Sequence, residues 1–315
     1  MSLDRRTTAL LINTFYGIVE KYSIPIERFR CSDCDDIDYF KLDSIFLVSD
    51  PKIGSRLGIN YVRSTRDSVE IIIPSISSDK DSDSLRQFIT ISQCSVGLLA
   101  ISAVVWDAGL YLADFLFHYF SSTSKCNDEK VSGLSSPPLF SLGSRVIDLG
   151  CGTGIVGICA LLCGAEYVLF TDGCNTLAES NINSLPNHEN YAGKYSFLEY
   201  EWSASLQGFV PPEFLLQSSS ESNPSSQKWD TVLCSDILYE SKSHSALLKL
   251  LESIPFRQAV FAYKKRHAIE EEAFFQSLSS WCHLHVVDPS LIGLRLVNIS
   301  HEELSELYII IATPK

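Results

Sequence analysis

From residue 145 to the end, short apolar runs alternate with segments of helical periodicity. Seven runs predict β-strands: RVIDLG (145–150), YVLFTDG (167–173), KYSFLEYEW (194–202), WDTVLCSDILY (229–239), RQAVFAYKK (257–265), HLHVVD (283–288) and ELYIIIAT (306–313). Four segments between them predict helices: 155–165, 176–185, 243–254 and 268–281. This alternation predicts an α/β fold, a mostly parallel sheet with helices on both faces. A loop without a clear helix joins the last two strands, so we expect them to pair antiparallel.

The first part of the chain follows a different pattern. It predicts a helix over residues 6–21 and β-like runs at 44–49, 59–64, 69–74 and 87–92. We therefore divide the chain into an α+β accessory region (1–94) and an α/β domain (95–315). A Ser-rich stretch near 215–228 predicts an insertion in a surface loop.

Residues 95–120 form an apolar segment that approaches the length of a membrane-spanning helix, about 20 residues. Asp107 and Asp114 lie within it, and each carboxylate would be costly in lipid. Their spacing of seven places both on one helical face. The segment therefore predicts a mostly buried helix that starts near Trp106, and we expect no membrane partner.

The composition is that of a folded protein, with 45% hydrophobic and 20% charged residues among 315. A net charge of −13 argues against a general nucleic-acid binder. It suits a basic protein substrate, although solubility alone explains such a charge equally well. Cys31 and Cys34 form a CxxC with no second pair at zinc spacing, so we expect no structural metal. No signal peptide is evident, and we expect a monomer of the cytoplasm or the nucleus.

The stretch VIDLGCGTGIVG (146–157) carries the chemistry, because its glycines run directly out of a predicted strand. Gly152-x-Gly154-x-x-Gly157 matches a dinucleotide fingerprint, whereas Asp148-x-Gly150-x-Gly152-x-Gly154 matches a loop that holds S-adenosylmethionine. Asp172 ends the next strand and would accept hydrogen bonds from ribose hydroxyls, which both cofactors have. Asp148 separates the two, since a carboxylate opposes a pyrophosphate but suits a ligand with an ammonium and a sulfonium. Gly157 then becomes a helix-packing residue.

These residues resemble the class I, seven-strand S-adenosylmethionine methyltransferases with a Rossmann-like sheet. Within that class they are similar to the methyltransferase-like protein-lysine branch, family 16. Besides the glycine loop, three stretches carry the resemblance: VWDAGLYLADFL (105–116), EYEW ending at Trp202, and Asp236-Ile-Leu-Tyr239. It covers residues 95–315, while the Ser-rich insertion departs from compact members.

The resemblance implies a role for each site residue. Gly150, Gly152 and Gly154 would hold the methionine part of the donor, Asp148 its ammonium and Asp172 its ribose. Donor contacts are implied for Trp106, Trp202 and Ser235, with Trp202 near the adenine. Asp236 and Tyr239 would line the entrance for a lysine of a protein substrate.

Other interpretations stay open from the sequence. Each tryptophan can be a core anchor, and Asp236 can cap the following helix. The acceptor can be a histidine or a small molecule, or the chain can be an idle donor-binding module. The run Lys264-Lys265-Arg266-His267 is interpreted as a solvated strand end rather than a nuclear signal.

Overall fold

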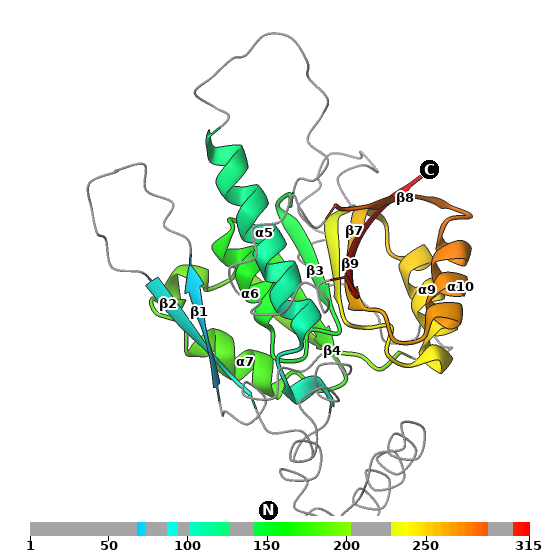
Figure 1. Cartoon of the computed structure of the whole chain (residues 1–315). Coiled ribbons are helices and arrows are strands. Elements are labelled where there is room, and N and C mark those ends of the chain that lie inside the picture. Colours follow the sequence, from blue (N-terminus) through cyan, green and yellow to red (C-terminus); the bar gives the residue numbers. More distant parts are fainter. Residues whose placement is uncertain (1–67, 74–86, 94–100, 126–141, 203–227, 289–304) are drawn as a thin grey trace, which may run out of the picture.

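The computed structural model describes residues 68–73, 87–93, 101–125, 142–202, 228–288 and 305–315 (Figure 1). The helix expected over 6–21, the runs at 44–49 and 59–64, the Cys31–Cys34 pair and all but the last residue of the Ser-rich stretch lie outside these ranges.

The core of the fold is a seven-stranded sheet in the order β5-β4-β3-β6-β7-β9-β8. Its strands are β3 (Arg145–Leu149), β4 (Tyr167–Asp172), β5 (Tyr195–Glu199), β6 (Trp229–Ser235), β7 (Phe256–Lys264), β8 (Cys282–Val286) and β9 (Leu307–Pro314). The first five in this order pair in parallel, and β9 lies antiparallel between β7 and β8. The predicted mostly parallel sheet with an antiparallel final pair is confirmed.

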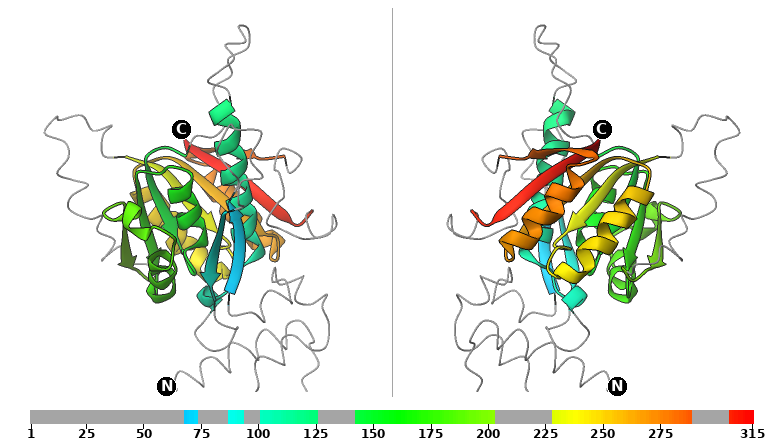
Figure 2. Two further views of the ribbon diagram at one scale, coloured as in Figure 1. Left: turned by 90° about the vertical axis from the view of Figure 1, so that its left-hand side faces the viewer. Right: turned by 90° about the vertical axis from the view of Figure 1, so that its right-hand side faces the viewer.

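Helices cover both faces of this sheet (Figure 2). One layer holds α5 (Asp107–Lys125), α6 (Ile155–Leu162) and α7 (Thr176–Asn183), and the other holds α9 (His244–Ser253) and α10 (Ala268–Leu278). Strand side chains alternate between the two cores, as the two-residue period of a strand requires. In β4, for example, Phe170 packs with the first layer and Leu169 with the second.

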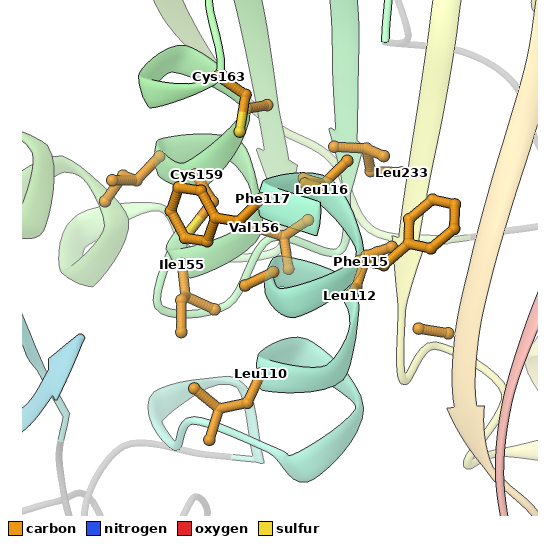
Figure 3. Close-up of a cluster of buried hydrophobic side chains, with 14 of the residues drawn as sticks. Leu110, Leu112, Phe115, Leu116, Phe117, Ile155, Val156, Cys159, Cys163 and Leu233 are labelled. Carbon is orange, nitrogen blue, oxygen red and sulfur yellow. The ribbon is translucent and has the colours of Figure 1, made fainter. Parts of the chain in front are cut away.

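Helix α5 is buried over residues 107–117. Its apolar side chains, including Leu112 and Phe115, gather with Val156 and Cys159 of α6 (Figure 3). Asp107 and Asp114 are buried as well. The predicted buried helix near Trp106 is confirmed, and no helix within the described ranges has the length and apolarity that a membrane span needs.

A small hairpin adds to the first layer. Strands β1 (Ser68–Ile73) and β2 (Gln87–Ser92) pair antiparallel, and Ile71, Ile89 and Ile91 join the same core as α5 and α6. Buried Asn181 of α7 ties β2 to the rest: its Oδ1 accepts from Ser92 N–H (2.7 Å), and its Nδ2 donates to the carbonyls of Ser92 (3.0 Å) and Thr153 (2.9 Å). Since Thr153 belongs to the glycine loop, one side chain braces hairpin, helix and loop together.

Three short 3₁₀ turns complete the described chain: η1 (Ile101–Ala103), η2 (His188–Tyr191) and η4 (Ser241–Ser243).

Candidate donor and acceptor site

The glycine loop follows β3 at the carboxyl edge of the sheet, where open α/β sheets bind ligands. Gly150, Gly152 and Gly154 have φ of 71°, 52° and 78°, a left-handed conformation that favours glycine. A Cβ on Gly152 would lie 2.8 Å from the backbone carbonyl oxygen of Ser102. The N–H groups of Gly150 and Cys151 donate to the Thr171 carbonyl at 2.8 and 2.9 Å, which fixes the loop against β4.

Asp148 lies beneath this loop and is fully buried. Its Oδ2 accepts the Gly157 N–H at 2.8 Å, while Oδ1 has no hydrogen-bond partner among the described residues. Burial raises the pKa of Asp148 to about 7, and the charge of Asp172 adds to the increase. A Cβ on Gly157 would lie 2.3 Å from the Phe170 ring, so the packing role expected for Gly157 agrees with the geometry.

Asp172 ends β4 beside the loop and is half-buried. Its Oδ2 accepts the Gly152 N–H at 2.9 Å and its Oδ1 the Cys174 N–H at 3.3 Å. Burial raises the pKa of this carboxyl, and the hydrogen bonds oppose the increase. Two carboxylates at the loop suit a ligand with hydroxyl and ammonium donors and oppose one with a pyrophosphate.

Side chains from other elements converge on the same edge. A Cβ on Gly150 would lie 2.7 Å from the Trp202 ring and 2.9 Å from Ile237. Ser235 ends β6, and its Oγ would lie 3.2 Å from a Cβ on Gly109 of α5. The structure thus brings Trp202, Ser235 and the Asp236–Tyr239 stretch to the glycine loop from distant parts of the sequence.

Tyr239 lies among acidic groups on this edge. Burial raises the pKa of its phenol to about 12, with further contributions from the charges of Glu240, Asp172 and Asp236. The hydroxyl therefore keeps its proton at neutral pH and is available as a hydrogen-bond donor.

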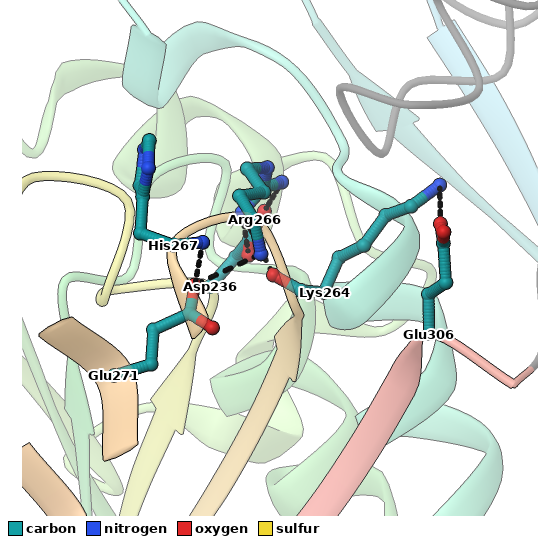
Figure 4. A network of polar contacts seen from close by, with 6 residues as sticks. All are labelled: Asp236, Lys264, Arg266, His267, Glu271 and Glu306. Atoms are coloured by element: carbon teal, nitrogen blue, oxygen red, sulfur yellow. Dashed lines mark hydrogen bonds and ion pairs between the residues drawn. The ribbon is translucent and has the colours of Figure 1, made fainter. Parts of the chain in front are cut away.

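Asp236 does not cap the following helix, which begins only at His244. Its side chain is 5% exposed and pairs with Arg266 through two parallel hydrogen bonds, 2.8 Å from Nη1 to Oδ1 and 2.7 Å from Nη2 to Oδ2 (Figure 4). The φ of Asp236 is 54°, uncommon for a residue other than glycine. Its N–H donates to the Ala262 carbonyl at 2.7 Å, which holds this conformation against β7.

Arg266 is a site residue that the sequence interpretation missed. The run at 264–267 is wrongly described as a solvated strand end: the side chains of Arg266 and Lys264 are only 8% and 2% exposed. Lys264 pairs with Glu306 at 3.5 Å, and Lys265, which pairs with Glu272, is 35% exposed. The Arg266 guanidinium also lies over the ring of Trp106, 5.7 Å from its centroid, which links Trp106 to the Asp236 end of the site.

The described residues contain no group of three or more His, Cys, Asp or Glu side chains that could hold a metal ion. The polar groups at this edge are the two carboxylates at the loop, the Asp236–Arg266 pair and Tyr239.

Comparison with known proteins agrees with this geometry. A family model described as lysine methyltransferase matches residues 86–281. The chain is 28% identical over 183 residues to the protein N-lysine methyltransferase METTL21A of Mus musculus, covering 57% of this chain and 67% of that protein. It is 27% identical over 185 residues to the EEF1A lysine methyltransferase 3 of Xenopus tropicalis, covering 57% and 65%. The chain thus spans about two thirds of the length of these relatives. Because the family model matches more than half of the sequence, the chain belongs to the lysine methyltransferase family of S-adenosylmethionine-dependent enzymes.

Proposed function

We propose that this protein transfers the methyl group of S-adenosylmethionine to the side-chain amine of a lysine in a protein substrate, at the edge formed by the glycine loop and the Asp236–Tyr239 stretch. One observation carries the proposal. The strand that leads to Asp236, β6, is paired in parallel with β3, the strand that leads to the glycine loop. Neighbouring parallel strands end at the same edge, so donor and acceptor groups meet there.

For the donor, we assign binding to residues of the loop and the edges around it. The left-handed glycines leave room for the methionine part, and Oδ1 of Asp148 is a buried acceptor that an ammonium would satisfy, directly or through one water. Asp172 keeps acceptor capacity for ribose hydroxyls. Trp202, with Trp106 and Ser235, would complete the donor contacts.

For the acceptor, the donor supplies an electrophilic methyl group, and the protein has to present an uncharged amine in line with it. The phenol oxygen of Tyr239 can accept an N–H of the amine and leave the nitrogen lone pair free for attack, while Asp236 stands fixed beside it. Strong base catalysis is unnecessary, because orientation within a water-poor site accounts for much of such a rate.

The relatives are named for lysines of proteins, and one is named for EEF1A. From the net charge of −13, we propose a protein substrate with a basic surface around the target lysine. We further propose that the enzyme acts as a monomer in the cytoplasm or the nucleus, without nucleic acid or membrane.

The test is incubation with isotope-labelled S-adenosylmethionine and a lysate of matching cells, followed by mass spectrometry of the labelled residue. The wild-type enzyme should transfer the label to a lysine of a lysate protein. The Asp236→Ala variant should transfer no label and should still bind the donor in calorimetry. Glu252→Ala, an exposed acid on α9, is the matched control and should label normally. Label on histidine or a small molecule would replace the acceptor assignment. Donor binding with no labelled product would identify an idle binding module.

A further inference from the structure

Arg266, the partner of Asp236, is itself fixed by several contacts. This arginine follows β7 and precedes α10, so its backbone is fixed on both sides. Its N–H donates at 3.0 Å to Glu271, which also accepts the His267 N–H, and its Nη1 lies 3.4 Å from the Lys264 carbonyl. Trp106 lies under its guanidinium. A long side chain held in this way has little freedom left to leave Asp236.

The pairing determines what Asp236 can do. Both of its carboxylate oxygens accept from Arg266, and the pair is almost excluded from water. Bidentate arginine–carboxylate pairs of this kind are strong and geometrically specific. The charge of Asp236 is therefore already balanced by Arg266, and Asp236 is not a free counter-ion for a substrate ammonium.

Charged and titratable groups face this pair from every packed element. Asp107 of α5 and Glu271 of α10 act on the guanidinium together with Asp236, and the pKa of Arg266 is raised although burial opposes the increase. Tyr239 is close enough to feel the charges of Glu240, Asp172 and Asp236. Lys264 adjoins the pair through its carbonyl, and its ammonium is paired with Glu306. Arg266 is thus a cation surrounded by three carboxylates, those of Asp107, Asp236 and Glu271, at the place where the acceptor would enter.

We infer that Arg266 is a positioning residue that fixes Asp236 and, by its charge, makes the site accept the substrate lysine as the uncharged amine. The inference rests on the proposed function. With Arg266 in place, an incoming ammonium meets a satisfied carboxylate and a nearby positive charge, so loss of its proton is favoured. Without that charge, Asp236 would hold the substrate lysine as the ammonium, which has no lone pair with which to attack the methyl group until it loses a proton.

The experiment compares Arg266→Lys, which keeps the charge, with Arg266→Gln, which removes it but can still donate to Asp236. The readout is the pH dependence of kcat, measured on the substrate protein that the lysate experiment identifies. Removing a unit charge beside the acceptor in a partly buried site should raise the kcat–pH midpoint by about one to two pH units. Arg266→Lys should turn over more slowly with the wild-type midpoint. Arg257→Gln removes an exposed charge at the opposite end of β7 and should leave the midpoint unchanged.

Thermal melts and donor calorimetry show that each variant is folded, and Arg266→Met is a second uncharged variant if Arg266→Gln is not. An inactive uncharged variant beside an active Arg266→Lys also supports the inference. Wild-type midpoints in both Arg266→Gln and Arg266→Lys overturn it, as does equal loss of activity in both when donor binding is intact. If wild type itself labels no lysine, the proposed function has failed instead, before any Arg266 variant is compared.

Discussion

Replacing Asp148 with asparagine should stabilise the folded protein above pH 7 and weaken its binding of the donor. The change is almost isosteric, so the packing around the side chain is kept. It removes a negative charge from a site with no exposure to water, and the retained carbonyl oxygen can still accept the Gly157 N–H. The buried carboxylate is a cost to folding that a purely structural residue would not carry.

The size of the effect follows from the pKa. Burial raises the pKa of Asp148 from 3.8 in the unfolded chain to about 7 in the folded one. The folded state therefore binds the proton more tightly, and stability falls as pH rises from about 4 to about 7. Three pKa units correspond to about 4 kcal/mol. The asparagine amide adds two donors at the position of Oδ1, where the described residues supply no hydrogen-bond partner, and this costs about 1–3 kcal/mol. The net gain in the free energy of unfolding is then about 1–3 kcal/mol at pH 8.

Urea unfolding of wild type and Asp148→Asn at pH 4.5 and pH 8 measures this gain. The advantage of the variant should be present at pH 8 and absent at pH 4.5, where the wild-type carboxyl is protonated in the folded state. Asp230→Asn is the matched control with the opposite sign, because the Asp230 carboxylate accepts two backbone N–H groups and pairs with Arg257. An Asp148→Asn protein that is less stable than wild type at pH 8 would refute the reasoning.

The same carboxyl should link donor binding to pH. If the ionised form of Asp148 holds the donor ammonium, affinity should fall about eightfold from pH 7.5 to pH 6, as a group with a pKa near 7 gains its proton. Calorimetry of S-adenosylmethionine binding should show this slope in wild type and a weak, pH-independent affinity in Asp148→Asn. An equal slope in the two proteins would place the titrating group elsewhere.

Two further substitutions test the loop and its support. Gly152→Ala puts a Cβ 2.8 Å from a backbone carbonyl oxygen at a φ of 52°. Donor affinity measured by calorimetry should therefore fall at least about tenfold. Wild-type affinity in this variant would show that the loop does not need this glycine. Asn181→Ala removes the hydrogen-bond partner of the Ser92 N–H and of the Ser92 and Thr153 carbonyls, and should lower the free energy of unfolding by about 2–4 kcal/mol. Ser184→Ala, which removes an exposed hydroxyl, is the control and should lower it by less than about 0.5 kcal/mol. Equal urea midpoints for these two variants would contradict the bracing role of Asn181.

Much of the fold was predictable because each strand and helix of the sheet domain is defined by its own short stretch of sequence. Each strand of the α/β domain is an apolar run bounded by turn residues, and each helix between strands has its own periodicity, so RVIDLG and IVGICALL define β3 and α6 without help from distant residues. The glycine loop was predictable for the same reason, since a strand, three glycines and a helix are contiguous. What no local pattern contains is the bracing by Asn181, which joins groups 89 and 28 residues away in the sequence.

The run at 264–267 shows why the acceptor side was harder to predict than the donor side. Lys264 ends β7, whereas Lys265 and Arg266 lie in the turn between β7 and α10, so these three adjacent cations enter three different surroundings. Lys264 is buried and paired with Glu306, Lys265 is at the surface beside Glu272, and Arg266 reaches Asp236 from 30 residues away. From the sequence alone, the three cations look like one basic patch. The pairing of β6 with β7 is what brings one of them, Arg266, to Asp236. An assignment of Asp236 from its motif alone therefore omits the partner that fixes its charge, and variants of Asp236 should be interpreted as changes to the Asp236–Arg266 pair.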